Sequence, residues 1–367
     1  MALKCGIVGL PNVGKSTLFN CLSNAKAQSA NFPFCTIEPN VGTISIPDNR
    51  LERLETLVNP ERVVPNTMEI VDIAGLVKGA HEGEGLGNQF LGNIRETDAI
   101  IHVLRCFEDG NIIHVDGSVD PIRDKETIDL ELQLKDLDTV EGRIAKLIRT
   151  VKSGDKVANK QNDLYHRIKE ALESGESARV VECQNEDEIE YMAELQLITS
   201  KPVLYLCNVD EAALRDGGNQ YVNAVKEAVK DEDAEVLMLA AALEADIAGF
   251  EDYDERQMFL EDAGLEEPGV NQLIRSAYKL LNLSTYFTAG VKEVRAWTIK
   301  VGMKAPQAAG VIHTDFEKGF IRAEVIKYDD YVELGSESAC RDAGKLSVEG
   351  KDYTVGDGDV MHFRFNV

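Results

Sequence analysis

The residues best suited to chemistry lie near the amino terminus, in the segment Gly9-Leu-Pro-Asn-Val-Gly14-Lys15-Ser16. This segment matches the pattern G-x-x-x-x-G-K-S/T, and it stands between a strand-like run and a helical one, where the pattern binds phosphate. Glycines allow backbone N–H groups to converge on phosphate oxygens, while the helix amino terminus adds the positive end of its dipole. We expect Lys15 to reach the β- and γ-phosphates in catalysis and the Ser16 hydroxyl to coordinate Mg²⁺. The predicted phosphate-contacting residues are Gly9, Asn12, Val13, Gly14, Lys15, Ser16 and Thr17.

A second motif, Asp72-Ile-Ala-Gly75, ends the apolar run Met68–Ile73. A carboxylate at the end of a strand can hold the hydration shell of Mg²⁺, so Asp72 is a predicted metal ligand. The Gly75 N–H is predicted to meet the γ-phosphate during catalysis. A threonine between the two motifs should add its hydroxyl to the metal and sense the γ-phosphate through its N–H. Thr36 is the candidate, with Thr43 as the alternative.

Two residues bear on the hydrolysis step itself. Leu76 follows Gly75, where many GTPases carry a glutamine that orients water, and a leucine cannot do this. The attacking water must therefore be placed by another group, or the intrinsic rate is low. Asn12 raises a further hypothesis, because in some such enzymes an asparagine there accompanies a K⁺ ion that replaces an arginine finger.

The base-reading segment is Asn208-Val209-Asp210-Glu211, directly after the strand-like run Pro202–Cys207. Guanine-specific proteins of this kind carry N-K-x-D, whose aspartate accepts two hydrogens from guanine. Here Val209 replaces the lysine and the longer Glu211 replaces the aspartate, so the contact that discriminates guanine is lost. We therefore predict that ATP binds as well as GTP or better. The stretch Ala240–Glu244 follows another strand and is predicted to supply the last base-contacting loop through Ala240 and Glu244.

The bulk composition narrows the class of protein. The formal net charge is −25, with 44% hydrophobic and 28% charged residues. This acidity argues against nonspecific nucleic-acid binding but permits a local basic patch. No apolar run approaches the roughly 18 residues of a transmembrane helix, so no membrane association is expected. Seven scattered cysteines without a C-x-x-C pair predict neither a zinc site nor a disulfide framework, which fits a cytoplasmic location. A monomer is expected.

Short apolar runs alternate with helical stretches over much of the chain. This alternation predicts an α/β fold, a mainly parallel sheet with flanking helices that carries the phosphate loop. The domain is predicted to be discontinuous and to cover residues 1–125 and 200–280. Its strand-like runs are Lys4–Leu10, Met68–Ile73, Ala99–Cys106, Pro202–Asn208 and Glu235–Ala240.

Residues 126–199 replace that alternation with a helical period. Apolar residues there follow a 3-4-3-4 spacing typical of a coiled-coil seam, at Leu137, Val140, Ile144, Leu147 and Val151. Basic residues three apart drift along one side of the same stretch, at Arg143, Lys146, Arg149 and Lys152. They form either a solvated face or a docking strip for the phosphate backbone of the ribosome or another RNA.

Residues 281–367 predict a small α+β module. Its expected strands are separated by glycine and charged turns, at Val294–Val301, Gly310–His313, Ala323–Ile326, Lys351–Val355 and Asp359–Phe365.

These features together resemble the YchF (Obg-like ATPase) family of P-loop proteins over essentially the whole chain. The segments that carry the resemblance are Lys4–Thr17, Asn31–Asn40, Asp72–Ala80 and Asn208–Glu211. The resemblance implies a nucleotide-binding domain, an inserted helical coiled coil and a C-terminal TGS domain of the β-grasp type. It also implies ATP preference, Mg²⁺ dependence, weak intrinsic hydrolysis and association with ribosomes. His114 matches a histidine considered for catalysis in this family. The other interpretation, which the sequence favours, is a loop residue with structural hydrogen bonds.

The function predicted is thus a Mg²⁺-dependent ATPase that acts as a nucleotide switch on the ribosome or RNA and also accepts GTP. A GTP-specific switch and a ribosome-binding scaffold with incidental hydrolysis are the alternatives. A metabolite kinase is disfavoured, because the α/β part shows no arginine cluster suited to a phosphate lid.

Overall fold

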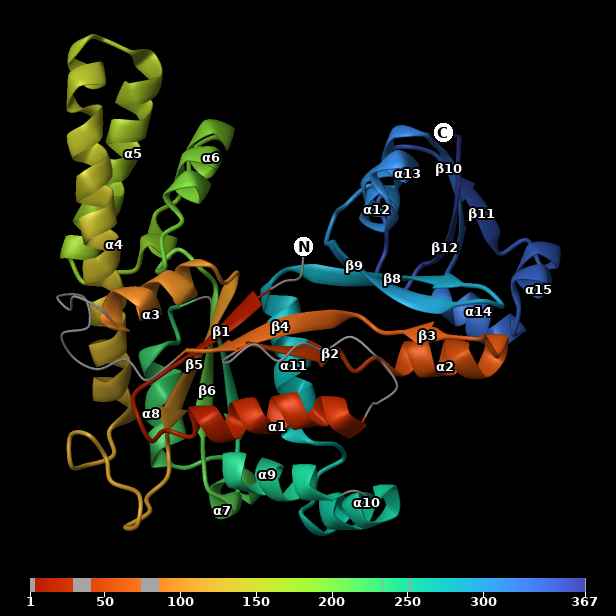
Figure 1. The fold of residues 1–367 in the computed structure, drawn as a ribbon, viewed down its shortest axis with the longest axis horizontal. Helices are drawn as coiled ribbons and strands as arrows, with labels where there is room; N and C mark the ends of the chain where they lie inside the picture. Colours follow the sequence, from red (N-terminus) through yellow and green to blue (C-terminus); the bar gives the residue numbers. More distant parts are fainter. Residues whose placement is uncertain (1–3, 29–40, 74–85, 233, 251, 367) are drawn as a thin grey trace. The chain divides into compact units, whose positions relative to one another are not determined.

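The computed structural model describes residues 4–28, 41–73, 86–232, 234–250 and 252–366 (Figure 1). Two compact units emerge, one formed by Met1–Ile44 with Glu69–Leu273 and the other by Ser45–Met68 with Ile274–Val367. The segment 45–68 therefore groups with the C-terminal unit, although the sequence placed it in the nucleotide-binding domain. The physical reason is core packing, because Leu51 and Leu54 of this segment are buried in a cluster with strands of the C-terminal unit.

The first unit contains a six-stranded sheet in the order β2-β4-β1-β5-β6-β7, in which the β1–β4, β1–β5, β5–β6 and β6–β7 pairs are parallel. The side chains of β5 and β6 are buried throughout, as expected of strands covered on both faces. The strands are β1 (Lys4–Val8), β2 (Val41–Ser45), β4 (Thr67–Asp72), β5 (Ala99–Arg105), β6 (Val203–Asn208) and β7 (Glu235–Leu239). All five strands that the apolar runs predicted in this part of the chain are confirmed.

Helices connect the parallel strands or follow the last of them, β7. They are α1 (Lys15–Gln28), α3 (Leu86–Arg95), α7 (Glu211–Arg215), α8 (Gln220–Ala228), α9 (Ala241–Gly249), α10 (Tyr253–Asp262) and α11 (Gly269–Leu280). The division between the two units falls within α11. The carboxyl ends of parallel strands lie at the same edge of the sheet. The loops that follow β1, β4 and β6 therefore begin close together, and these loops contain the predicted motifs.

A helical region is inserted between β5 and β6. Its helices are α4 (Pro121–Lys152), α5 (Lys156–Glu173), a short 3₁₀ turn (Ala178–Val180) and α6 (Glu186–Leu195). The first half of α4 packs on β5 and α8, while its second half lies beside α5 as a hairpin that extends from the sheet (Figure 1). The predicted seam lines this hairpin, because Val140 is buried with Leu164 and Ile168, and Leu137, Ile144 and Leu147 pack against them.

The second unit is built on a mixed six-stranded sheet in the order β11-β10-β12-β8-β9-β3. Its elements are α2 (Asn49–Val58), β3 (Val63–Val64), β8 (Leu283–Ala289), β9 (Val294–Lys300), α12 (Ala305–Ile312), α13 (Thr314–Lys318), β10 (Phe320–Ile326), α14 (Tyr328–Leu334), α15 (Glu337–Asp342), β11 (Leu346–Glu349) and β12 (Val360–Phe365). Two separate apolar clusters pack in this unit, one with α12 and the other with α2.

Two predicted strands of the second unit are wrong. The run Gly310–His313 ends the helix α12, whose alanines are buried against the sheet. Lys351–Val355 is a turn with one isolated bridge from Thr354 to Lys304. Neither run is long enough for its periodicity to distinguish a strand from a buried helix or turn. Over the described ranges of both units, no helix is sufficiently long and apolar to cross a membrane.

Candidate nucleotide-binding site

The loop between β1 and α1 has a backbone that only glycine can form at two points. Gly14 has a φ of 100°, and a Cβ there would lie 2.3 Å from Nδ2 of Asn208. A Cβ on Gly9 would lie 2.5 Å from the backbone oxygen of Val103. The loop therefore approaches Asn208 and Val103 too closely for a side chain at either position, so its backbone path requires glycine. Ser16 and Thr17 are exposed in the first turn of α1.

Lys15 and Asp72 form the charged centre of this loop. The Lys15 ammonium is buried and donates to the backbone oxygen of Leu10 at 2.6 Å. Burial lowers its pKa to about 8, although the nearby Asp72 carboxylate opposes the change. Burial likewise raises the pKa of Asp72, against the effects of Lys15 and of a hydrogen bond with Ser16. Burial thus outweighs the attraction between the two charges, as expected where further charges come from a ligand.

These residues suit a divalent cation beside a triphosphate. The Oδ1 atom of Asp72 is buried and has no hydrogen-bond partner among the described residues. An orphaned carboxylate oxygen is costly unless something satisfies it. Together with the Ser16 hydroxyl it forms the all-oxygen donor set that Mg²⁺ prefers. The other predicted ligand, Thr36, and the predicted catalytic Gly75 lie outside the described residues.

Asn208 connects the phosphate loop to the loop at Ala240–Ala241, which the sequence predicted to contact the base. Its amide Nδ2 donates to the backbone oxygen of Val13 at 2.9 Å, and its Oδ1 accepts the Ala241 N–H at 3.0 Å. The side chain is buried, so the amide holds two loops in register. The sequence had assigned Asn208 to nucleotide contact, whereas in the structure its side chain is committed to the protein.

The other residues that the sequence predicted to contact the base lie in two different environments. Val209 and Ala240 are buried beside Asn208 at the carboxyl edge of the sheet. Glu211 lies half exposed in α7, where its carboxylate pairs with Arg215 at 2.6 Å. This placement agrees with the loss of a guanine-reading carboxylate at that position.

Glu244 has a role that the sequence did not reveal. Its buried carboxylate accepts the N–H of Gly269 at 2.7 Å and that of Val270 at 3.3 Å. These are the first two residues of α11, so Glu244 caps that helix and is not free to contact a base.

A second loop, residues 107–120, lies against the phosphate loop, and we call it the histidine loop. Asn12, itself at a positive φ of 62°, donates its Nδ2 to the backbone oxygen of Ile113 at 3.2 Å. Arg105, at the end of β5, fixes the loop from within. Its guanidinium donates to the backbone oxygens of Phe107, Asp109 and Ile112 at 3.0 to 3.2 Å. A single buried arginine thus shapes the loop that carries His114.

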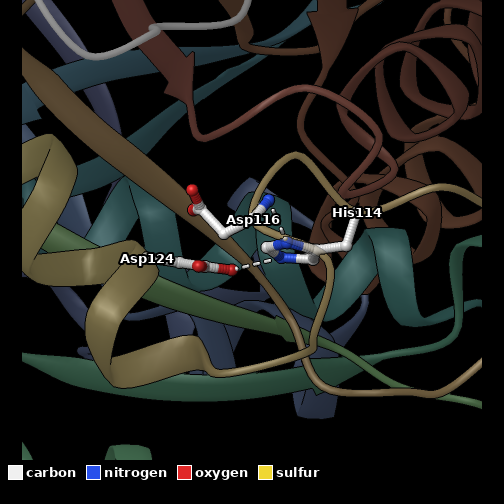
Figure 2. Close-up of side chains that lie close together, drawn as sticks. All are labelled: His114, Asp116 and Asp124. Atoms are coloured by element: carbon white, nitrogen blue, oxygen red, sulfur yellow. Dashed lines mark hydrogen bonds and ion pairs between the residues drawn. The ribbon is translucent and has the colours of Figure 1, made fainter.

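His114 lies between its own loop and the first turn of α4 (Figure 2). The Asp116 N–H donates to Nδ1 at 3.1 Å, so Nε2 carries the proton and donates to Oδ2 of Asp124 at 2.8 Å. The His114 side chain is only 5% exposed and that of Asp124 only 2%. Arg123 completes the arrangement through Oδ1 of Asp124 at 3.2 Å and the backbone oxygen of Ser118 at 2.6 Å.

The trio His114, Asp116 and Asp124 has the composition of a metal site, since its ligand atoms lie within 4.8 Å of one another. Two observations argue against a metal. Both ring nitrogens already have hydrogen-bond partners. The positive charge beside the carboxylates comes from Arg123, whose guanidinium lies 3.2 Å from Asp124 and 3.7 Å from Asp116. The cluster is therefore a hydrogen-bonded and ion-paired network.

The fold and this site define the chain as a P-loop nucleoside triphosphatase of the GTPase fold. A family model described as "50S ribosome-binding GTPase" matches residues 4–143. Another, YchF-GTPase_C, described as "Protein of unknown function (DUF933)", matches residues 283–366. The chain belongs to the YchF family.

Relatives of similar length show that the chain belongs to this family. A protein of Haemophilus ducreyi named "Ribosome-binding ATPase YchF" is 56% identical over 367 residues, all of both chains. The protein of Bacillus subtilis with the same name is 54% identical over 368 residues, again all of both chains. "Obg-like ATPase 1" of Rattus norvegicus is 47% identical and covers all of this chain and 93% of its own. The solved Schizosaccharomyces pombe YchF GTPase superposes with a TM-score of 0.88 at 38% identity, covering 99% of this chain and 97% of the other.

Proposed function

We propose that this chain is a Mg²⁺-dependent ATPase that works as a nucleotide switch on the ribosome. The observation that carries the proposal is the phosphate loop with its buried Lys15 and orphaned Asp72 oxygen, beside a base loop without the N-K-x-D side chains. The names of the relatives, "Ribosome-binding ATPase YchF", support both the reaction and the partner. We also propose that residues 126–199 and residues 281–367 form two further domains, each separate from the nucleotide-binding domain.

Ser16, Asp72 and Thr36 would hold the Mg²⁺ ion, with Asp72 acting directly or through water. The ion would neutralise charge on the β- and γ-phosphate oxygens. Lys15 would bind the same phosphates, and the N–H groups of Gly14 and Gly75 would orient them. His114 would act on the attacking water, because Leu76 cannot and because Asn12 ties the histidine loop to the phosphate loop.

The nucleotide preference is tested by equilibrium affinities for ATP and GTP, measured side by side with Mg²⁺ present. We expect equal or tighter binding of ATP, since Val209 and Glu211 replace the guanine-reading pair and Glu211 pairs with Arg215. A tenfold or larger preference for GTP, worth about 1.4 kcal/mol, would show that other groups recognise guanine.

A monovalent cation is part of the proposal. Asn12 would place K⁺ beside the phosphates, where its charge would serve in place of an arginine finger. We expect faster ATP hydrolysis in K⁺ than in Na⁺ at equal ionic strength. Equal rates in the two salts would remove K⁺ from the mechanism.

A further inference from the structure

Asp124 is a buried carboxylate to which the phosphate-loop motifs give no role. It lies in the first turn of α4, and its two oxygens have different partners. Oδ2 accepts the Nε2–H of His114, and Oδ1 accepts the guanidinium of Arg123. Burying a carboxylate costs free energy that only complete pairing offsets. An ordinary helix start would not require this arrangement, because Asp120 already caps α4 by accepting the N–H groups of Ile122 and Arg123.

The contacts of the His114 ring define its tautomer. Nδ1 accepts a backbone N–H, so it carries the lone pair, and Nε2 carries the proton. The two contacts are not equally strong. The Asp116 amide is neutral, two residues away in the same loop and only partly buried, whereas Asp124 is charged, buried and fixed on a helix. The Nδ1 contact is therefore the one that another donor can displace.

We propose that Asp124 is a positioning residue for ATP hydrolysis. It holds His114 in the tautomer and orientation that leave Nδ1 as the acceptor for the attacking water. This inference rests on the proposed function, in which His114 acts on that water. In many enzymes a histidine acts as a general base through one ring nitrogen while a carboxylate holds the other, and Asp124 would have that second role here.

The water oxygen forms a bond to the γ-phosphorus, and the bond from that phosphorus to the β–γ bridging oxygen breaks, leaving its electron pair on ADP. The proton of the water passes to Nδ1, where the water has displaced the Asp116 amide. The resulting imidazolium is stabilised by Asp124, and it then releases the proton to solvent or to inorganic phosphate.

Arg123 keeps Asp124 in place during this step. Its guanidinium contacts Oδ1, so the carboxylate cannot rotate away from His114 without losing that pair. The same guanidinium also donates to the backbone oxygen and the hydroxyl of Ser118 in the histidine loop. Arg123 thus couples the orientation of the carboxylate to the position of the loop.

The first test is steady-state ATP hydrolysis by the full-length Asp124→Asn variant. The new amide can no longer accept both contacts, so we expect kcat to fall at least about tenfold, while the KM for ATP changes less than about twofold. Asp138→Asn makes the same chemical change at an exposed site of α4 and should leave both constants unaltered. In a His114→Ala background, Asp124→Asn should cause no further loss, because the two residues act as a unit.

The second test reads the tautomer in the nucleotide-free wild-type protein, independently of turnover. Histidine-selective ¹⁵N labelling gives signals from six residues, and His114→Ala identifies the one of interest. At pH 8 we expect a protonated Nε2 and an unprotonated Nδ1, and a shift toward the other tautomer in Asp124→Asn. A wild-type His114 with its proton on Nδ1 overturns the proposal, even if the Asp124 variant does not fold.

The outcomes separate this inference from the function on which it rests. If His114→Ala binds ATP and turns over at the wild-type rate, the catalytic assignment of His114 fails and the role of Asp124 fails with it. If His114→Ala is slow but Asp124→Asn is normal, His114 remains catalytic and only the positioning role of Asp124 is wrong. A faster Asp124→Asn enzyme also overturns the proposal, because the carboxylate would then restrain the histidine.

Discussion

At the scale of the residue, burial of Lys15 makes nucleotide binding a proton-linked event. Its pKa is lowered to about 8, so in the free protein it is about half charged at pH 8 and mostly neutral at pH 9. A triphosphate favours the charged form, so binding near pH 8 takes up a proton, and affinity falls as the pH rises from 7 to 9. Calorimetry of ATP binding at pH 8 should therefore give an enthalpy that varies with the ionisation enthalpy of the buffer.

The matched control is Lys15→Arg, whose guanidinium stays charged over this range. It should show no such buffer dependence wherever it still binds ATP. A wild-type enthalpy that is the same in all buffers would mean that Lys15 is fully charged before the nucleotide arrives.

Functional residues that belong to a short contiguous motif could be predicted from the sequence. Lys15, Ser16 and Asp72 meet as expected, because a contiguous loop and a strand end determine their geometry. Arg105 and Asp124 escaped prediction, since a buried arginine bound to three carbonyls and an aspartate in a first helical turn have no distinctive spacing. Only the folded loop shows which partners they choose.

At the scale of the element, a buried carboxylate in the middle of α4 holds this helix to a distant segment of the chain. Asp136 accepts the N–H groups of Ile198 and Thr199 at 2.9 and 2.7 Å and the Thr199 hydroxyl at 2.8 Å. It is fully buried and connects the middle of α4 to the segment that leads into β6. Its removal leaves these donors unsatisfied, which costs about 3 kcal/mol.

We therefore predict that Asp136→Ala loosens this junction. Hydrogen exchange at the Ile198 and Thr199 amides should accelerate by about 100-fold, the rate equivalent of that free energy. Asp138→Ala, at an exposed position one half-turn further along α4, should leave both amides protected. Unchanged exchange in Asp136→Ala would show that water or backbone groups replace the carboxylate.

Elements with a long, continuous pattern were predictable and short ones were not. Five strands of the first unit agree with the apolar runs within about two residues at each end, the normal uncertainty of element boundaries. The sixth, β2, was not predicted. The seam from Leu137 to Leu147 predicted the α4–α5 hairpin because many turns repeat the same spacing. The run Gly310–His313 contains too few residues for a period, so its helical state depends on packing against the sheet.

At the scale of the whole molecule, the division of the chain depends on contacts between distant segments. Segment 45–68 joins the C-terminal unit through β3, which pairs with β9, and through the buried leucines of α2. No local pattern reveals such pairing across more than 200 residues, because each strand is compatible with many partners. The order of motifs along a chain therefore predicts the nucleotide site better than it predicts domain boundaries.

The basic strip Arg143, Lys146, Arg149 and Lys152 offers a test of ribosome binding that involves the chain as a whole. All four side chains are exposed in the second half of α4, where the hairpin extends from the sheet. In a protein of net charge −25, a cationic strip is an unusual surface and suits a phosphate backbone.

Replacing Arg143, Lys146 and Arg149 by glutamate should weaken binding to ribosomes and flatten its dependence on salt. Each lost phosphate contact should reduce the slope of log K against log salt by about one. The control triple, glutamate at Lys226, Lys230 and Lys279, makes the same change in net charge at exposed sites on or beside α8 and α11. Equal weakening by both triples would mean that total charge, and not the strip, governs association. No weakening by either would leave the strip as a solvated helix face.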